Sequence, residues 1–138
     1  MQLEFGFICD YALYDGVKVS ALGIGFDTIY ASEVPCVHPT FHLVVQLRAS
    51  VAEVGDKDIS IRLIDADGAD VIKHVTGVMN VPQPLPGTID SKGVLVVGFG
   101  GVSFPKYGDY TLFLTVQGQD MARIPIRIAQ PPQPPATI

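Results

Sequence analysis

Apolar and polar side chains alternate along the last third of the chain, with a period of two residues. In the segment 111–116, leucine and valine share one face and threonine takes most of the other. In the segment 123–128, isoleucine alternates with arginine and proline. This period is typical of β-strands that have one packed face and one solvated face. The two segments therefore predict a closing β-hairpin.

The same pattern recurs upstream, with turn residues between the apolar stretches. Phe41–Val51 gives the clearest alternation, and Val94–Phe99 is apolar on both faces. In Val17–Tyr30 the apolar phase slips by one residue beside Gly23 and Gly25, which predicts a β-bulge inside a single strand. Further strands are expected at residues 3–9, 59–64 and 71–75.

Glycine and proline predict how these strands are connected. Asp15-Gly16 is a strong signal for a tight hairpin turn. Residues 80–87 contain three prolines, which cannot donate to a hydrogen-bonded ladder. We therefore expect this segment to be an extended crossover between sheets.

About eight short strands at this spacing predict an all-β fold. We expect an antiparallel β-sandwich with Greek-key or jelly-roll links, immunoglobulin-like or C2-like in plan. Residues 1–130 are expected to form one domain, and residues 131–138 a Pro-rich flexible tail. The predicted core consists of Phe5, Phe7, Leu43, Val45, Leu47, Ile61, Leu63, Leu112, Leu114, Ile124 and Ile126.

The composition points towards buried or partnered surfaces. Charged residues make up 17% of the chain, against about 25% in ordinary globular domains. Such a low share indicates either many strands buried on both faces or a surface that meets a partner. The net charge of −5 and the scattered basic residues argue against nucleic acid as that partner.

The sequence predicts no membrane span and a cytoplasmic location. No apolar run approaches the ~20 residues that a transmembrane helix needs. The start of the chain lacks the basic segment of a signal peptide and has Glu4 in its place. Reduced thiols are then expected, with Cys9 as a small core residue. The even cysteine count also allows a Cys9–Cys36 disulfide, which a reducing compartment disfavours.

Tyr110 has the setting of a tyrosine corner. It follows Gly108-Asp109 at the start of a predicted strand and shares the phase of the core residue Leu112. In such a corner the tyrosine hydroxyl bonds back to nearby backbone. We expect a structural role, because no general base stands next to Tyr110 in the sequence.

The Asp65–Asp70 loop holds three carboxylates and raises the question of calcium. An EF-hand would need ligands at its fifth and twelfth positions, where this chain has Ala69 and Thr76. A C2-like site would need a second acidic loop. Asp56 and Asp58 lie at the far end of the intervening strand, about 20 Å away. A polar hairpin turn is the simpler interpretation.

Cys36, His38 and His42 resemble a fragment of a zinc site. Pro39 prevents the helix on which the two histidines would converge, and on an extended chain they stand about 13 Å apart. His74 is expected on another strand. No nucleophile motif or phosphate-binding loop is present in the sequence, so we expect neither an enzyme nor a cofactor.

Exposed apolar positions are the remaining functional signal. Phe113 lies on the wet phase of its strand, and Val94, Val96 and Phe99 belong to the strand that is apolar on both faces. Either a second layer of the fold covers these residues or a partner does. The sequence favours a non-enzymatic protein-binding or self-assembly module that uses these four residues. The alternative is a C2-like module that binds calcium or a small polar ligand through Asp65–Asp70.

Several short motifs resemble a family of uncharacterised small bacterial proteins, known only as a domain of unknown function. The resemblance covers residues 1–130 and implies a compact β-sandwich of bacterial origin. It implies no activity, substrate or cofactor, because the motifs consist of turn and core residues. They are Phe7–Ala12, Leu22-Gly23-Ile24, Pro35, His38-Pro39, Leu63–Gly68 and Gly108-Asp109-Tyr110.

Overall fold

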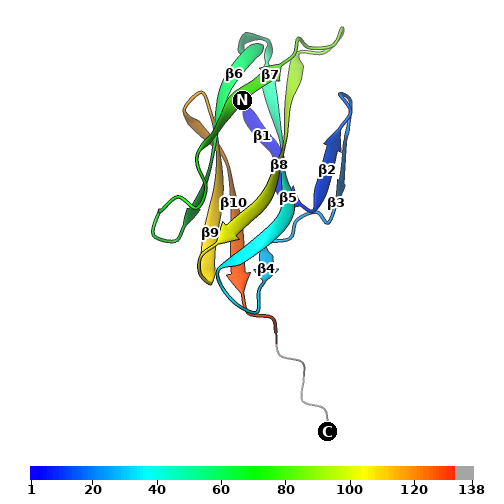
Figure 1. Cartoon of the computed structure of the whole chain (residues 1–138). Helices are drawn as coiled ribbons and strands as arrows, with labels where there is room; N and C mark the ends of the chain where they lie inside the picture. The colour runs from blue at the N-terminus through cyan, green and yellow to red at the C-terminus, as the bar shows by residue number, and fades with distance from the viewer. Residues whose placement is uncertain (133–138) are drawn as a thin grey trace.

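A computed structural model describes residues 1–132 as an all-β chain (Figure 1). The strands are β1 (Gln2–Cys9), β2 (Tyr11–Tyr14), β3 (Val19–Leu22), β4 (Thr28–Tyr30), β5 (Cys36–Ser50), β6 (Gly55–Asp65), β7 (Val75–Val81), β8 (Asp90–Phe104), β9 (Gly108–Val116) and β10 (Gln119–Ala129). In these residues the one helical element is the 3-10 turn η1 (Val51–Glu53), and no helix is long and apolar enough to span a membrane. Most of the predicted tail, residues 131–138, lies outside the described residues.

The ten strands form three sheets. One has three antiparallel strands in the order β1-β5-β8, and another has five in the order β4-β10-β9-β6-β7. The third is the hairpin β2-β3, which stands at the right of Figure 1. The all-β prediction is confirmed. The predicted strand count and purely antiparallel pairing are wrong, because residues 1–132 form ten strands and β4 runs parallel to β10.

The main core gathers buried side chains from both larger sheets. It includes the predicted residues Leu43, Val45, Leu47, Ile61, Leu63, Leu112, Leu114, Ile124 and Ile126. The core prediction is wrong for Phe5 and Phe7, because Phe5 is exposed and Phe7 is half-buried. Both lie on the outer face of β1, because Phe7 pairs with the outward Val44 while Gly6 pairs with the inward Val45. Alternation alone does not tell which face of a strand meets the core.

Val17–Tyr30 is not the single bulged strand that the sequence predicts. It forms β3 and β4, which belong to different sheets. Gly23 and Gly25 have φ angles of 67° and 79°, in the left-handed region that glycine adopts at little cost. A Cβ atom at Gly23 would also lie 2.2 Å from the Asp10 carboxylate. The two glycines therefore turn the chain away from the hairpin.

Other strand limits also differ from the prediction. Residues 71–74 lie in a loop, and the strand follows them as β7. β5 begins earlier than predicted, at Cys36, and β8 continues past its glycines to Phe104. The Pro-rich segment 82–87 joins β7 to β8, which confirms a crossover between sheets.

The closing hairpin β9–β10 is confirmed. Its two-residue turn has positive φ at both positions, 51° at Gln117 and 77° at Gly118, as a tight hairpin turn with the native twist requires. Gln117 also ties the turn to β6. Its backbone N–H donates to the Asp58 carbonyl, and its side-chain oxygen accepts from the Asp58 N–H, both at 2.8 Å.

Candidate functional site

The β2–β3 hairpin covers part of the outer face of the three-stranded sheet. Ala12 on its inner face joins Cys9 and Val44 in a small buried cluster, against which Phe7 and Val96 pack. Burial raises the pKa of the Cys9 thiol. The hairpin is therefore a second layer that covers some of the apolar side chains on the outer face of this sheet.

The Asp15-Gly16 turn holds the hairpin in shape, as the sequence predicts. The Asp15 carboxylate accepts hydrogen bonds from the backbone N–H groups of Val17 and Lys18, both at 2.8 Å. These bonds lower the pKa of Asp15. Gly16 takes a φ of 94°, and the Tyr14 hydroxyl donates to the Gly16 carbonyl at 3.1 Å. Val17 is left almost fully exposed at the tip.

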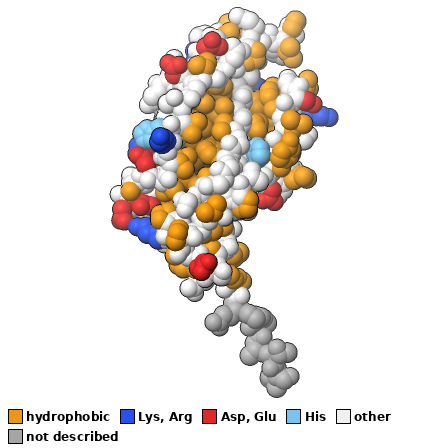
Figure 2. Space-filling view, in the orientation of Figure 1, with side chains coloured by type: hydrophobic (Ala, Val, Ile, Leu, Met, Phe, Trp, Pro, Cys, Tyr) orange, Lys and Arg blue, Asp and Glu red, His pale blue; other side chains and the backbone are white. Residues whose placement is uncertain are grey.

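The opposite, outward face of the hairpin is mostly apolar and largely exposed, although the Tyr11 ring also lies edge-on to His42. Tyr11 pairs directly with Leu22, and Leu13 pairs with Ser20, so the four side chains share one face. Tyr11, Leu13 and Leu22 are exposed by 53%, 56% and 70%. Figure 2 shows hydrophobic atoms gathered over this part of the molecule, at the right. We call these four side chains the outward face.

A shallow depression of about 590 Å³ lies at the base of the hairpin. Asp10 and His38 contribute its ionisable groups, while Ile24 and Tyr30 are its exposed apolar residues. Burial lowers the pKa of His38, and the nearby Asp10 charge opposes that shift. The depression continues the apolar surface of the hairpin beyond Leu22.

The four predicted interface residues have different surroundings. Val96 lies under the hairpin, and Val94 is half-buried in a groove that Tyr14 also lines. Phe99 is buried and stacks on Phe41, with ring centroids 5.0 Å apart. This places Phe99 in the core and removes it from any surface.

Phe113 does lie on the outer face of the five-stranded sheet, as predicted, but it is half-buried. The Arg123 guanidinium lies 4.8 Å from the centre of its ring. Arg62 pairs with Phe113 from the other side. Arg123 therefore gives the Phe113 ring a cation–π partner within the chain.

A further apolar area is visible between β8 and the neighbouring strands in Figure 2. Other partly exposed apolar side chains outside the hairpin are Leu95 and Val97 of β8, and Val71, Ile72 and Val75. These side chains are half-buried and pack against the main core. They are less available to a partner than the outward face of the hairpin.

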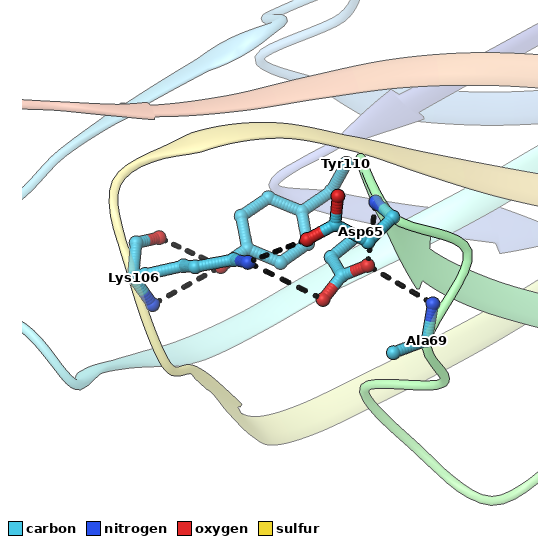
Figure 3. A network of polar contacts seen from close by, with 5 residues as sticks. Asp65, Ala69, Lys106 and Tyr110 are labelled. Carbon is cyan, nitrogen blue, oxygen red and sulfur yellow. Dashed lines mark hydrogen bonds and ion pairs between the residues drawn. The ribbon is translucent and has the colours of Figure 1, made fainter.

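The carboxylates of the Asp65–Asp70 loop are engaged within the chain (Figure 3). Asp65 accepts hydrogen bonds at 2.9 Å from the backbone N–H groups of Ala69 and Asp67. The Lys106 ammonium lies 3.2 Å from the Asp67 carboxylate and 3.7 Å from that of Asp65. The Ala69 hydrogen bond lowers the pKa of Asp65 against the opposing effect of burial, and the Asp67 N–H and Lys106 lower it further.

Asp70 points to different partners. Its two carboxylate oxygens each lie 3.2 Å from a nitrogen, one of Arg62 and one of His74. His74 is therefore accounted for by a contact with the Asp70 carboxylate on the surface. The three carboxylates of the loop do not converge on one point.

Tyr110 forms the predicted corner (Figure 3). Its hydroxyl donates to the Lys106 carbonyl at 2.6 Å and accepts from the Lys106 backbone N–H at 3.2 Å. The ring is buried and meets Phe104 edge-on, with centroids 5.0 Å apart. The structural interpretation of Tyr110 is confirmed.

The structure does not assemble the fragment Cys36, His38 and His42 into a site. His38 lies near the rings of Phe26 and Phe41, and His42 lies edge-on to Tyr11 at 5.0 Å. Both cysteines are free thiols. Across residues 1–132, no three His, Cys, Asp or Glu side chains are placed to hold a metal ion.

The outward face of the hairpin was missed in the sequence. Its signal lies on both sides of the Asp15-Gly16 turn, where Tyr11 and Leu13 precede the turn and Leu22 follows it. The segment 11–14 is too short to stand out as a strand. The inward positions Ala12 and Ala21 are also small, which weakens the alternation.

Fold and surface together define an all-β protein whose separate hairpin exposes an apolar face. The chain belongs to a family of unknown function, DUF6941, whose sequence profile matches residues 4–129. This confirms the resemblance to a family of unknown function. No curated protein and no solved structure matches the chain.

Proposed function

We propose that this protein is a non-enzymatic module that binds protein, as further copies of itself or as another chain, through the outward face. The observation that carries the proposal is the exposure of Tyr11, Leu13 and Leu22 side by side on an isolated hairpin. Contiguous apolar surface of this kind marks interaction sites in proteins that otherwise keep such side chains apart.

Physical chemistry supports a partner for this face. Burial of apolar surface contributes about 25 cal/mol per Å², so leaving large side chains in water forgoes several kcal/mol. A two-stranded hairpin is only marginally stable by itself, and a layer on its outward face would add to its packing. The low charged share of the chain, 17%, points the same way.

The proposal moves the surface away from the residues that the sequence favoured. Val96 and Phe99 are covered inside the fold, and Phe113 lies beside Arg123. Val94 is half-buried beside the tip of the hairpin and can border the proposed surface. The kind of function stays as proposed from the sequence, whereas its location changes.

The alternative, a C2-like module that binds calcium or a polar ligand through Asp65–Asp70, has less support. Lys106 pairs with Asp65 and Asp67, and Arg62 pairs with Asp70. A cation would have to displace these partners, and calcium wants about six to eight oxygen ligands. No contact in the loop favours this candidate.

For the architecture, we propose a β-sandwich of the immunoglobulin-like or C2-like kind, with the two larger sheets as its layers. The support is a single core cluster built from both of those sheets. The Greek-key or jelly-roll links and the bacterial origin implied by the resemblance stay predictions.

The proposed function is tested by chemical cross-linking in the organism that encodes the protein. The native chain should appear in a species heavier than its own 14.8 kDa, and Leu13→Asp should abolish that species. Val37→Asp is the matched control, because Val37 is similarly exposed, 63% against 56% for Leu13, and belongs to β5 and not to the hairpin. A heavier species that survives Leu13→Asp, or the lack of one in the native chain, would contradict the proposal.

A further inference from the structure

We infer that the partner is a second copy of this chain, with the two outward faces packed together and the two hairpins antiparallel about a two-fold axis. This inference rests on the proposed function and identifies the protein that binds the outward face. It depends on the size of the apolar surface, on its uncharged centre and on the charges at the two ends of the hairpin.

The exposed apolar surface is close to what a dimer needs. Six large side chains along the hairpin and its base are more than half exposed: Tyr11, Leu13, Val17, Leu22, Ile24 and Tyr30. Aromatic side chains carry about 150–250 Å² each and aliphatic ones somewhat less, so at these exposed fractions the six could bury on the order of 500–700 Å² per copy. Stable interfaces bury about 800 Å² per partner. The rims of the two hairpins would supply the remainder.

The centre of the outward face suits a two-fold contact. In such a contact the same patch meets itself, so a charge at the centre would face its own copy. Leu13, Ser20 and Leu22 are all uncharged. The charged residues of the hairpin lie at its ends, where a two-fold axis brings different residues together.

The two ends of the hairpin carry charges that have no ion-pair partner in residues 1–132. Lys18 lies at the tip, and Asp10 and Asp27 lie at the base. None of the three lies within 4 Å of an opposite charge. Figure 2 shows basic and acidic atoms side by side at the upper end of the hairpin, and acidic atoms at its lower end.

These charges cannot pair within one copy. Five residues of extended chain separate the tip from Asp10, which is about 16 Å. The tip also carries the Asp15 carboxylate, which stays charged and accepts from the backbone N–H groups of Val17 and Lys18. The Lys18 ammonium makes no ion pair with it, so this ammonium is available to the other copy. In an antiparallel pair of hairpins, each Lys18 would lie over Asp10 and Asp27 at the lower end of the other copy's hairpin. The two-fold axis repeats this contact, so the dimer has two of them.

A lipid surface fits the same charges less well. Anionic headgroups attract basic segments, whereas Asp10 and Asp27 flank the apolar face. The net charge of −5 adds repulsion over the whole molecule. A second copy, in contrast, supplies the lysine that these carboxylates lack.

Sedimentation velocity of the purified chain tests the inference with charge-reversal variants. Lys18→Glu and Asp27→Lys should each weaken the native dimer about tenfold, because each variant puts like charges together at two contacts. An equimolar mixture of the two variants should restore dimers, since both contacts then join opposite charges. Lys73→Glu makes the same charge change at an exposed loop lysine and should leave the dimer intact.

Several results would overturn the inference. One is a monomer at all concentrations up to about 100 µM, which is well above the dissociation constants of specific dimers. Another is a dimer that ignores both charge reversals. A third is a monomer that binds vesicles of phosphatidylcholine and phosphatidylserine. If the purified chain is monomeric but Leu13→Asp removes a cross-linked species in cells, the second copy is wrong and the proposed function stands. If neither the dimer nor that species is found, both fail.

Discussion

Tyr110 shows how one side chain connects sequence, packing and turn geometry. Its ring fills the core beside Phe104, while its hydroxyl satisfies both backbone groups of Lys106 in the turn before β9. A buried backbone group without a partner costs free energy, so the hydroxyl stabilises this turn. The corner was predictable because all of its parts lie within a few residues of one another.

Tyr110→Phe removes only the hydroxyl and should lower the free energy of unfolding by about 1–3 kcal/mol. Urea denaturation measures the loss. Tyr30→Phe is the matched control, because Tyr30 is exposed and its hydroxyl has no hydrogen bond within the described chain. Equal denaturation midpoints for native protein and Tyr110→Phe would refute the stabilising role of the corner.

Asp65 makes stability depend on pH. Its backbone and Lys106 contacts lower its pKa in the folded state, so its contribution is complete above the ordinary value of about 3.9. The contribution is lost as the pH falls through the folded pKa. In Asp65→Asn the free energy of unfolding should therefore fall less steeply between about pH 4 and pH 2. Parallel curves for the two proteins would contradict this role of Asp65.

At the scale of the element, β1 shows where the sequence was insufficient. Phe5, Phe7 and Cys9 do alternate, and the prediction of a strand is confirmed. They lie on the outer face, because the β2–β3 hairpin adds an apolar layer there. Period-two patterning specifies which side chains share a face, but the position of a second layer depends on distant residues.

The two faces of the three-stranded sheet should differ in their contribution to stability. Leu47→Ala empties a site in the main core and should cost about 2–5 kcal/mol. Phe5→Ala removes a ring that is 37% exposed and should cost about 1 kcal/mol. Thermal or urea unfolding measures both. A larger loss at Phe5 than at Leu47 would mean that Phe5 faces the core, as the sequence first predicted.

The errors in strand limits have local causes. The phase slip at Gly23 and Gly25 predicts a bulge, because the apolar pattern slips in the same way whether a strand bends or ends. The predicted position of β7 is too early in the chain. The prolines after β7 led to its last residues being assigned to the predicted crossover. The long hairpin β9–β10 was predictable, since neither of its strands is interrupted by glycine.

Calcium should leave the Asp65–Asp70 loop unaffected. Its carboxylates already pair with Lys106, Arg62 and His74, so little binding energy is available to a cation. The melting temperature should be the same with and without millimolar calcium, as differential scanning fluorimetry would show. A rise in melting temperature that disappears in Asp67→Asn would instead favour the C2-like alternative.

At the scale of the whole molecule, the low charged share has two sources. Part of the apolar sequence lies in a core shared by the two larger sheets, and part lies under the β2–β3 hairpin. A further part is exposed, on the hairpin and also elsewhere, as at Val78, Leu85 and Ile89. The sequence predicted both explanations, burial and a partner, but it could not assign them to residues, because that assignment requires the packing of distant strands.

The central claim is that the outward face binds protein, and we infer that the bound protein is a second copy of this chain. Light scattering of the purified chain at micromolar concentration tests this most directly. We expect a mass above the 14.8 kDa of one chain for the native protein and for Val37→Asp. Leu13→Asp should give one chain's mass with an unchanged circular dichroism spectrum. A native monomer would contradict the second copy as the partner, and a Leu13→Asp variant that still associates would contradict the outward face as the binding surface.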